Sequence, residues 1–172
     1  FHSFSKKFDL YINDAFSASH RDHSSITIPP QHIQSAISRE FEKEIKSFNP
    51  KTKRKLFILG GAKVDDYFPI FNELKNKNNK VLAAGVLANL FLIVKGYNLG
   101  YENKWLKSHN YLHLLPRLKS IYKKHENQII LPSDFGLITS KNKRLAVFLE
   151  SAPFSYKIFD IGPKSVQLFQ KH

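Results

Sequence analysis

Several residue types that mark common classes of protein are missing from this chain. Its 172 residues include no cysteine and no methionine. Without cysteine, disulfide bonds, thiolate catalysis and cysteine-ligated zinc or iron–sulfur centres are excluded. A reducing compartment suits such a composition, so we expect a cytoplasmic protein. Because a chain without methionine also lacks a translation start, we expect these residues to be an internal segment of a longer protein.

Long apolar runs and a secretory signal are also missing. The longest apolar stretch, residues 81–94, contains Asn89 and falls short of the roughly 20 residues that span a bilayer. The first residues lack the basic region followed by an apolar region that marks a secretory signal. The sequence therefore predicts no association with a membrane.

Acidic residues are scarce relative to basic ones. The chain has 27 Lys and Arg against 14 Asp and Glu, a formal net charge of +13. Such a charge attracts nucleic acid, acidic membrane surfaces or phosphorylated small molecules. The densest basic run, residues 51–55, follows an Asn-Pro pair and is typical of a solvated loop. No zinc-finger spacing or ribonucleoprotein motif is present. A basic module that binds nucleic acid nevertheless stays open as the alternative to an enzyme.

The apolar patterns predict an α/β fold. Hydrophobic residues make up 42% of the chain, enough to form a core. We predict strands at residues 8–12, 56–59, 80–84, 128–131, 137–139, 145–149 and 156–159, and helices at 32–48, 67–76, 86–95, 114–124 and 164–170. The apolar strand at 56–59 is typical of a strand buried on both faces of a parallel sheet. Two strand–turn–helix units in series indicate layered α/β architecture.

Glycine-containing turns follow two predicted strands and precede the last helix. Gly60-Gly61-Ala62-Lys63 joins a strand to a helix, so its backbone N–H groups could hold a phosphate while Lys63 adds a mobile charge. Gly85 follows the next strand, and Gly162-Pro163-Lys164 begins the last helix. Open α/β sheets bind ligands at the carboxyl edge, where such turns would meet. None of them is a Walker A loop, and an ordinary turn is the alternative for each.

Polar residues gather directly after the first predicted strand. Asn13 and Asp14 end that strand, and His20, Arg21 and His23 follow closely. Arg21 could hold a carboxylate or phosphate through two parallel N–H bonds, with the histidines assisting. A capped polar loop is the alternative.

Signatures of other enzyme classes are not found. His109 and His113 are four residues apart, but no glutamate follows His109 and no third ligand is evident, so a zinc site is not expected. There is no Gly-x-Ser-x-Gly elbow and no carboxylate pair with an acid–base signature. Covalent hydrolytic catalysis therefore has no support.

Five segments taken together resemble the phosphoglycerate kinase family. They are residues 8–23, 58–66, 81–92, 130–135 and 160–165. Their order and spacing agree with the family, and Asn-Asp-Ala-Phe followed by His-Arg and then Leu-Gly-Gly-Ala-Lys is specific to it. Ala-Gly-Val-Leu-Ala-Asn-Leu-Phe-Leu, at residues 84–92, resembles the archaeal branch.

The resemblance implies reversible phosphoryl transfer between ATP and 3-phosphoglycerate, which forms 1,3-bisphosphoglycerate and ADP, with Mg²⁺ accompanying the nucleotide. It implies a Rossmann-like parallel sheet in a partial nucleotide domain at residues 53–172. Residues 1–30 would end the 3-phosphoglycerate-binding N-terminal domain, and residues 31–52 would form an interdomain helix and hinge. Neither nucleic acid nor a membrane is an expected partner. Other family elements are not in the chain, so we expect it to be a central segment without activity of its own.

The resemblance also assigns residues. Arg21 and Lys63 would carry catalysis, with Lys63 contacting the transferred phosphoryl group. The residues implied for 3-phosphoglycerate are Asn13, Asp14, His20 and Arg21, and those implied for the nucleotide are Gly60, Gly61, Ala62, Lys63, Gly85, Gly162 and Lys164. Two positions depart from the family pattern, Tyr67 where many members have lysine and Ala84 where they have glycine.

Overall fold

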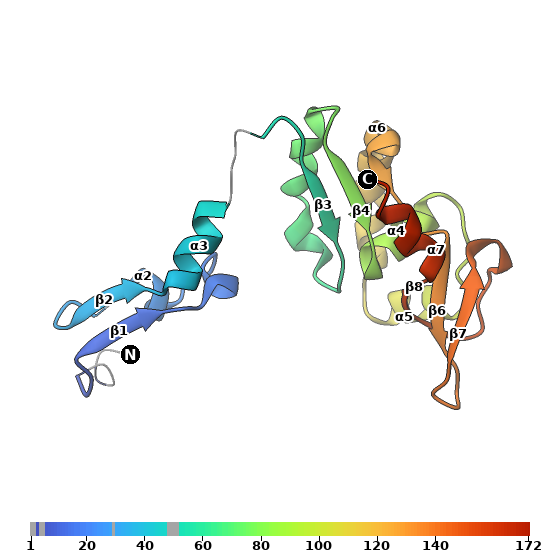
Figure 1. Cartoon of the computed structure of the whole chain (residues 1–172). Helices are drawn as coiled ribbons and strands as arrows, with labels where there is room; N and C mark the ends of the chain where they lie inside the picture. The colour runs from blue at the N-terminus through green and yellow to red at the C-terminus, as the bar shows by residue number, and fades with distance from the viewer. Residues whose placement is uncertain (1–2, 4–5, 29, 48–51) are drawn as a thin grey trace. The chain divides into compact units, whose positions relative to one another are not determined.

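The computed structural model describes residues 3, 6–28, 30–47 and 52–172, and the chain divides into two compact units, Phe1–Thr52 and Lys53–His172 (Figure 1). In the first unit, strands β1 (Leu10–Asn13) and β2 (Gln34–Ile37) pair in parallel. The 3₁₀ turn η1 (Phe16–Ala18) and the short helix α2 (Ser24–Thr27) connect them, and helix α3 (Arg39–Ser47) follows β2.

The helix predicted at residues 32–48 is wrong in its first half. Residues 34–37 form β2, in register with β1, and the helix begins only at Arg39. Ser38 marks the junction, because its Oγ accepts a hydrogen bond from the Phe41 N–H at 3.0 Å and so caps the helix. Pairing with a strand far away in the sequence overrides the local helical spacing. The last residue of that prediction, Phe48, lies outside the described residues.

The second unit contains a parallel sheet in the order β3-β4-β5, formed by Leu56–Leu59, Lys80–Ala83 and Ile129–Ile130. This sheet confirms the predicted parallel α/β fold. The predicted burial of β3 on both faces is wrong, because Leu56 is 44% and Ile58 70% exposed. Successive side chains of a strand point to opposite faces, and in the described part of the chain only the face with Leu59 is covered.

Helices cover that face of the sheet. The segment between β3 and β4 forms the 3₁₀ helices η2 (Val64–Tyr67) and η3 (Ile70–Lys75), which Pro69 separates, where one α-helix was predicted. The helices between β4 and β5 are α4 (Gly85–Val94), α5 (Tyr101–Ser108), η4 (Leu112–Leu114), α6 (Leu115–His125) and η5 (Glu126–Gln128). Helices α4 and α6 confirm the prediction, but α5 was not predicted.

A second sheet of this unit is antiparallel, with the order β7-β6-β8. Its strands are β6 (Asp134–Ile138), β7 (Arg144–Phe148) and β8 (Lys157–Ile161), and the 3₁₀ helix η6 (Leu149–Ser151) and the helix α7 (Pro163–Phe169) complete the unit. Strands β7 and β8 lie within two residues of the predicted positions, whereas β6 begins three residues before the strand predicted at 137–139. Their antiparallel pairing in a separate sheet was not predicted.

Helix α4 belongs to both hydrophobic cores of the second unit. Leu87 and Phe91 pack in the larger core, between the parallel sheet and α6, and Leu92 packs in the smaller core with Phe135 of β6. The N-terminus of α4 is therefore held firmly at the carboxyl end of β4. None of the helices in the described part of the chain has the length and hydrophobicity needed to cross a bilayer.

Candidate functional site

Gly61 and Gly85 lie against each other at the carboxyl ends of β3 and β4. The Val86 N–H donates to the Gly61 carbonyl at 3.3 Å. Both glycines have positive φ, +88° for Gly61 and +55° for Gly85, and a Cβ on Gly85 would lie 2.7 Å from the Gly61 nitrogen. Only glycine fits at Gly85 without displacing the neighbouring backbone. The structure thus brings two of the predicted turns together at one edge of the sheet.

A pocket of about 210 Å³ opens beside these glycines, and we call it the glycine pocket. Its wall contains Gly61 and Ala62 from the turn after β3, and Gly85 from the start of α4. The remaining lining residues come from α4, α5, β6 and β8 and are Val86, Asn89, Glu102, Trp105, Phe135, Lys157, Ile158, Phe159, Asp160 and Ile161. The turn after β3, the helices α4 and α5 and the antiparallel sheet therefore contribute to one site.

Two of the lining residues are buried polar side chains. Asn89 is 3% and Glu102 2% exposed, and the Asn89 Nδ2 donates to Glu102 Oε1 at 3.1 Å. The Ile158 N–H donates to Glu102 Oε2 at 3.2 Å. Burial raises the pKa of Glu102, and the hydrogen bonds from Ile158 and Asn89, with the charge of Lys157, offset this only in part. Asn89 Oδ1 is buried without a hydrogen-bond partner among the described residues.

Neither residue was predicted to belong to a site. In the sequence Asn89 stands out only as a polar residue within an apolar run, and no helix is predicted around Glu102. The position of Asn89 within an apolar run was the signal that could have revealed it, because a side-chain amide inside a buried helix must find a hydrogen-bond partner.

An aromatic side chain forms another wall of the glycine pocket. The Nζ of Lys157 lies 5.1 Å from the centroid of the Trp105 ring, and the rings of His109 and Tyr111 stack with that ring at 4.2 and 5.7 Å. His109 therefore has a packing role, and the described residues contain no cluster of metal-ligating side chains. Trp105 thus lines the pocket, and the sequence patterns did not predict this.

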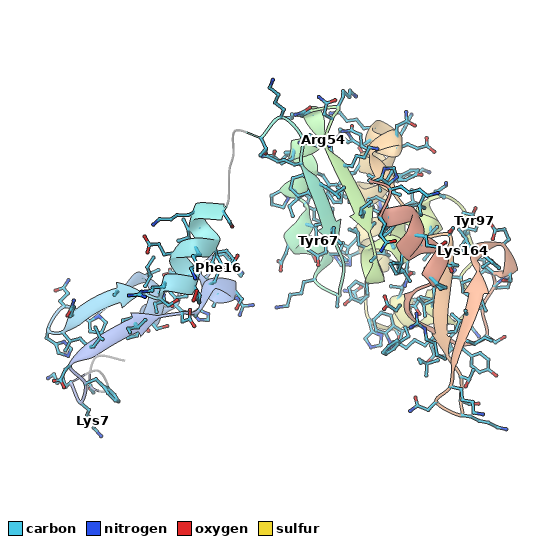
Figure 2. All side chains as sticks on the ribbon, in the orientation of Figure 1. Lys7, Phe16, Arg54, Tyr67, Tyr97 and Lys164 are labelled. Carbon is cyan, nitrogen blue, oxygen red and sulfur yellow. The ribbon has the colours of Figure 1, made fainter. Side chains whose placement is uncertain are left out.

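Lys63 is exposed and follows Ala62, a wall residue of the pocket. It does not itself line the pocket, and neither does Gly60. Tyr67, labelled in Figure 2, donates its hydroxyl to the Gly60 carbonyl. This tyrosine braces the turn that carries Lys63.

Backbone N–H groups at the start of α7 are already hydrogen-bonded within the fold. The N–H groups of Lys164 and Ser165 donate to the Asp134 carboxylate at 3.0 and 2.7 Å. Burial tends to raise the pKa of Asp134, but these bonds and the Ser165 hydroxyl outweigh burial and hold it below its usual value. A Cβ on Gly162 would meet the same carboxylate. The backbone donors predicted to bind an anion are thus already used within the fold: the Gly162 N–H donates to the Asp134 carbonyl at 2.8 Å, and the Lys164 N–H donates to its carboxylate. Neither residue lines the glycine pocket.

The polar loop of the first unit begins at the carboxyl end of β1. Asn13 Oδ1 accepts from the Ala15 N–H at 2.9 Å, and an oxygen of the Asp14 carboxylate accepts from the Ser38 hydroxyl. His20 and Arg21 follow η1 and are exposed, with no side-chain hydrogen bond or ion pair to any residue that the structure describes. Asn13 and Asp14 thus shape the loop, while Arg21 keeps its donors available.

Comparison with known proteins identifies the family. A family model described as phosphoglycerate kinase matches residues 1–172. The phosphoglycerate kinase of Archaeoglobus fulgidus is 38% identical over 94% of this chain and 41% of its own length, and that of Methanosarcina mazei is 36% identical over 92% and 40%. The structure of the Pyrococcus horikoshii enzyme matches 98% of this chain and 44% of its own chain, with 28% identity and a TM-score of 0.81.

These matches agree with the archaeal character of residues 84–92. The chain spans about two fifths of the length of the curated relatives that it matches. The fold, the meeting of the glycine turns and the match along the whole chain lead to one conclusion: the chain belongs to the phosphoglycerate kinase family.

Proposed function

We propose that this chain is the central part of a phosphoglycerate kinase that transfers a phosphoryl group reversibly between ATP and 3-phosphoglycerate. The observation that carries the proposal is the glycine pocket, formed where Gly61 and Gly85 meet at the carboxyl edge of a parallel sheet. Such an edge is where open α/β sheets bind nucleotides. The absence of cysteine from the sequence suits the cytoplasmic location expected for this enzyme.

The glycine pocket suits a nucleotide in shape and chemistry. Gly61 and Gly85 expose backbone to a phosphate, and the half-buried Trp105 places an aromatic side chain in the pocket lining for a base. Lys157 lines the same pocket and adds positive charge. The described residues contain no metal cluster of their own, so Mg²⁺ would arrive bound to the nucleotide, where it neutralises phosphate charge.

Lys63 would act on the phosphoryl group in transit. Phosphoryl transfer needs in-line positioning and dispersal of charge over the equatorial oxygens, with little covalent chemistry from the protein. An exposed ammonium next to the pocket wall, on a turn braced by Tyr67, can follow the moving group. This role explains how a kinase works without a nucleophilic side chain.

The first unit would hold 3-phosphoglycerate. Arg21 would bind its carboxylate or phosphate with paired N–H donors, His20 would assist, and Asn13 and Asp14 would set the loop that presents them. In this proposal residues 1–30 belong to the substrate domain, and so does β2, because it pairs with β1. The rest of residues 31–52 forms the connection and hinge, and residues 53–172 belong to the nucleotide domain.

Titration calorimetry of the chain with Mg–ADP, and separately with a short DNA duplex at several salt concentrations, tests the proposal. We expect weak but saturable binding of Mg–ADP. Binding to the duplex should be non-specific and should fall steeply as salt rises, because it would rest on counterion release alone. If Mg–ADP shows no saturation while the duplex still binds at high salt, the basic charge serves nucleic acid and the kinase proposal fails.

A further inference from the structure

A second hollow of the Lys53–His172 unit lies between η3 and α6, and we call it the α6 hollow. It measures about 400 Å³ and shares no lining residue with the glycine pocket. Its polar lining residues are Asn72, Arg117, Ser120, Lys124 and His125. Among the described residues that line it, none is Asp or Glu. The hollow is therefore basic and has no internal counter-charge.

Arg117 is fixed in orientation but has no counter-charge. Its Cζ lies 3.6 Å from the centroid of the Phe68 ring, and the Phe68 side chain is buried. Stacking on a buried ring holds the plane of the guanidinium and leaves its N–H edge free for a ligand. No hydrogen bond or ion pair joins this edge to any residue in the described ranges. Arg117 thus presents a pre-oriented fork of donors to the α6 hollow.

His125 has a mostly buried side chain and lines the same hollow. The side chain is 7% exposed, and its Nδ1 lies 3.1 Å from Gln128 Oε1. The Gln128 Nε2 donates to the carbonyls of Asn76 and Asn79, both at 2.9 Å, which identifies Oε1 as the acceptor. Nδ1 of His125 must therefore carry a hydrogen, and Nε2 is the ring nitrogen left to meet a ligand. No residue in the described part of the chain bonds to that Nε2.

From these three features we propose that the α6 hollow binds a phosphate group, either as the free ion or as a monoester. Arg117 and Lys124 would neutralise its charge, and the Ser120 hydroxyl and the Asn72 amide would donate to its oxygens. Nε2 of His125 would accept from the protonated phosphate oxygen. The apolar part of the wall, which includes Ile121, gives an organic monoester a surface for its body. This site is separate from the nucleotide site proposed above and does not depend on it.

Nitrogen NMR of the whole chain tests this proposal directly. The ring nitrogens of His125 are followed while inorganic phosphate or phenyl phosphate is added, with chloride replaced so that ionic strength stays constant. We expect a saturable change at Nε2, and a dissociation constant raised about tenfold by Arg117→Gln or Lys124→Gln, as for loss of a charge-assisted contact. Lys124 is exposed and has no partner among the described residues, so Lys124→Gln should fold even if Arg117→Gln disturbs Phe68.

Lys123→Gln is the matched control, because Lys123 is an exposed residue of α6 that does not line the hollow. It should change the dissociation constant less than about twofold, and so should Lys63→Ala. If phenyl phosphate binds more tightly than inorganic phosphate, the site is assigned to an organic monoester. If inorganic phosphate binds more tightly, the site is assigned to the free ion. Both results support the site. An equal loss in Lys123→Gln, a loss in Lys63→Ala, or the same change in chloride alone would overturn it.

Discussion

Gly85 has a hydrogen atom where any other residue would place a carbon 2.7 Å from the Gly61 nitrogen. Because that contact lies on the wall of the glycine pocket, the residue has two separable functions. It permits a positive φ at the start of α4, and it keeps the two turns close enough to form one site. A substitution therefore costs stability through the first function and ligand binding through the second.

Gly85→Ala should lower the free energy of unfolding by about 2 kcal/mol or more, since it adds a backbone clash to the usual cost of a positive φ. It should also abolish detectable binding of Mg–ADP. Gly96→Ala is the control, because Gly96 has a φ of +95° and its Cβ would have no neighbour within 4 Å. Urea unfolding and calorimetry check both variants. If Gly85→Ala left the binding of Mg–ADP unchanged, the glycines would not belong to the nucleotide site.

Arg21→Ala, in the intact protein, should weaken binding of 3-phosphoglycerate by about 1.5–3 kcal/mol, the value of a charge-assisted contact. Binding of Mg–ADP should stay within a few fold, because we propose that the nucleotide binds to the other unit. Arg39→Ala, which removes an exposed arginine at the start of α3, should affect neither ligand. Separate titrations with the two ligands measure this. An equal loss of affinity for both ligands would refute the proposal that the two units bind different ligands.

At the scale of elements, one buried hydrogen-bond network joins three segments in the wall of the glycine pocket. Glu102 of α5 accepts from Asn89 of α4 and from the Ile158 N–H of β8. The carboxylate is therefore the link between the helices and the antiparallel sheet. Because burial disfavours its ionised form, this link makes stability depend on pH.

The sign of this dependence follows from the raised pKa of Glu102. The unfolded chain releases the proton near the ordinary value of 4.5, before the folded chain does. The contribution of Glu102 to stability is thus fully present below that pH and is lost as pH rises through the folded pKa. In Glu102→Gln this loss should disappear, so the unfolding free energy of the variant relative to the wild type should rise from pH 4 towards neutrality.

Fluorescence of Trp105, the single tryptophan, reports unfolding of this region during urea titrations at each pH. Glu126→Gln, which changes an exposed carboxylate just after α6, should follow the wild-type profile. If the stability of Glu102→Gln also followed the wild-type dependence on pH, the buried carboxylate would not titrate in this range.

Local patterns in the sequence predicted the elements that belong to the repeated strand–turn–helix units. Strands β3 and β4 and helix α4 follow from apolar runs bounded by glycine, and the meeting of Gly61 with Gly85 follows from the geometry of parallel strands. Strand β2 could not be predicted in this way, because its partner β1 lies more than twenty residues earlier in the chain. Asn89 and Glu102 were missed because their partners become visible only when the helices pack.

At the scale of the whole molecule, apolar side chains stay exposed in both units. Leu10 and Ile12 of β1 and Leu56 and Ile58 of β3 are each more than 40% exposed. The chain spans about two fifths of the length of its relatives, so we expect the rest of a longer protein to cover these strands.

The 172-residue chain expressed alone should therefore show no measurable kinase activity and should self-associate. An enzyme loses most of its rate enhancement when one reactant is not positioned, since orientation lowers the activation barrier by about 7–11 kcal/mol. A coupled assay and analytical ultracentrifugation test these outcomes. Robust turnover of 3-phosphoglycerate by a monomeric chain would show that the site is complete without further sequence.

The central claim is that Lys63 stabilises a phosphoryl group in transit beside the glycine pocket, and the steady-state kinetics of Lys63→Ala in the intact protein test it most directly. The account predicts that kcat falls by about two to three orders of magnitude while the dissociation constant of Mg–ADP stays within a few fold, because the charge acts mainly in the transition state. Lys77→Ala, at an exposed lysine between η3 and β4, should retain wild-type kcat. An unchanged kcat in Lys63→Ala would contradict the account.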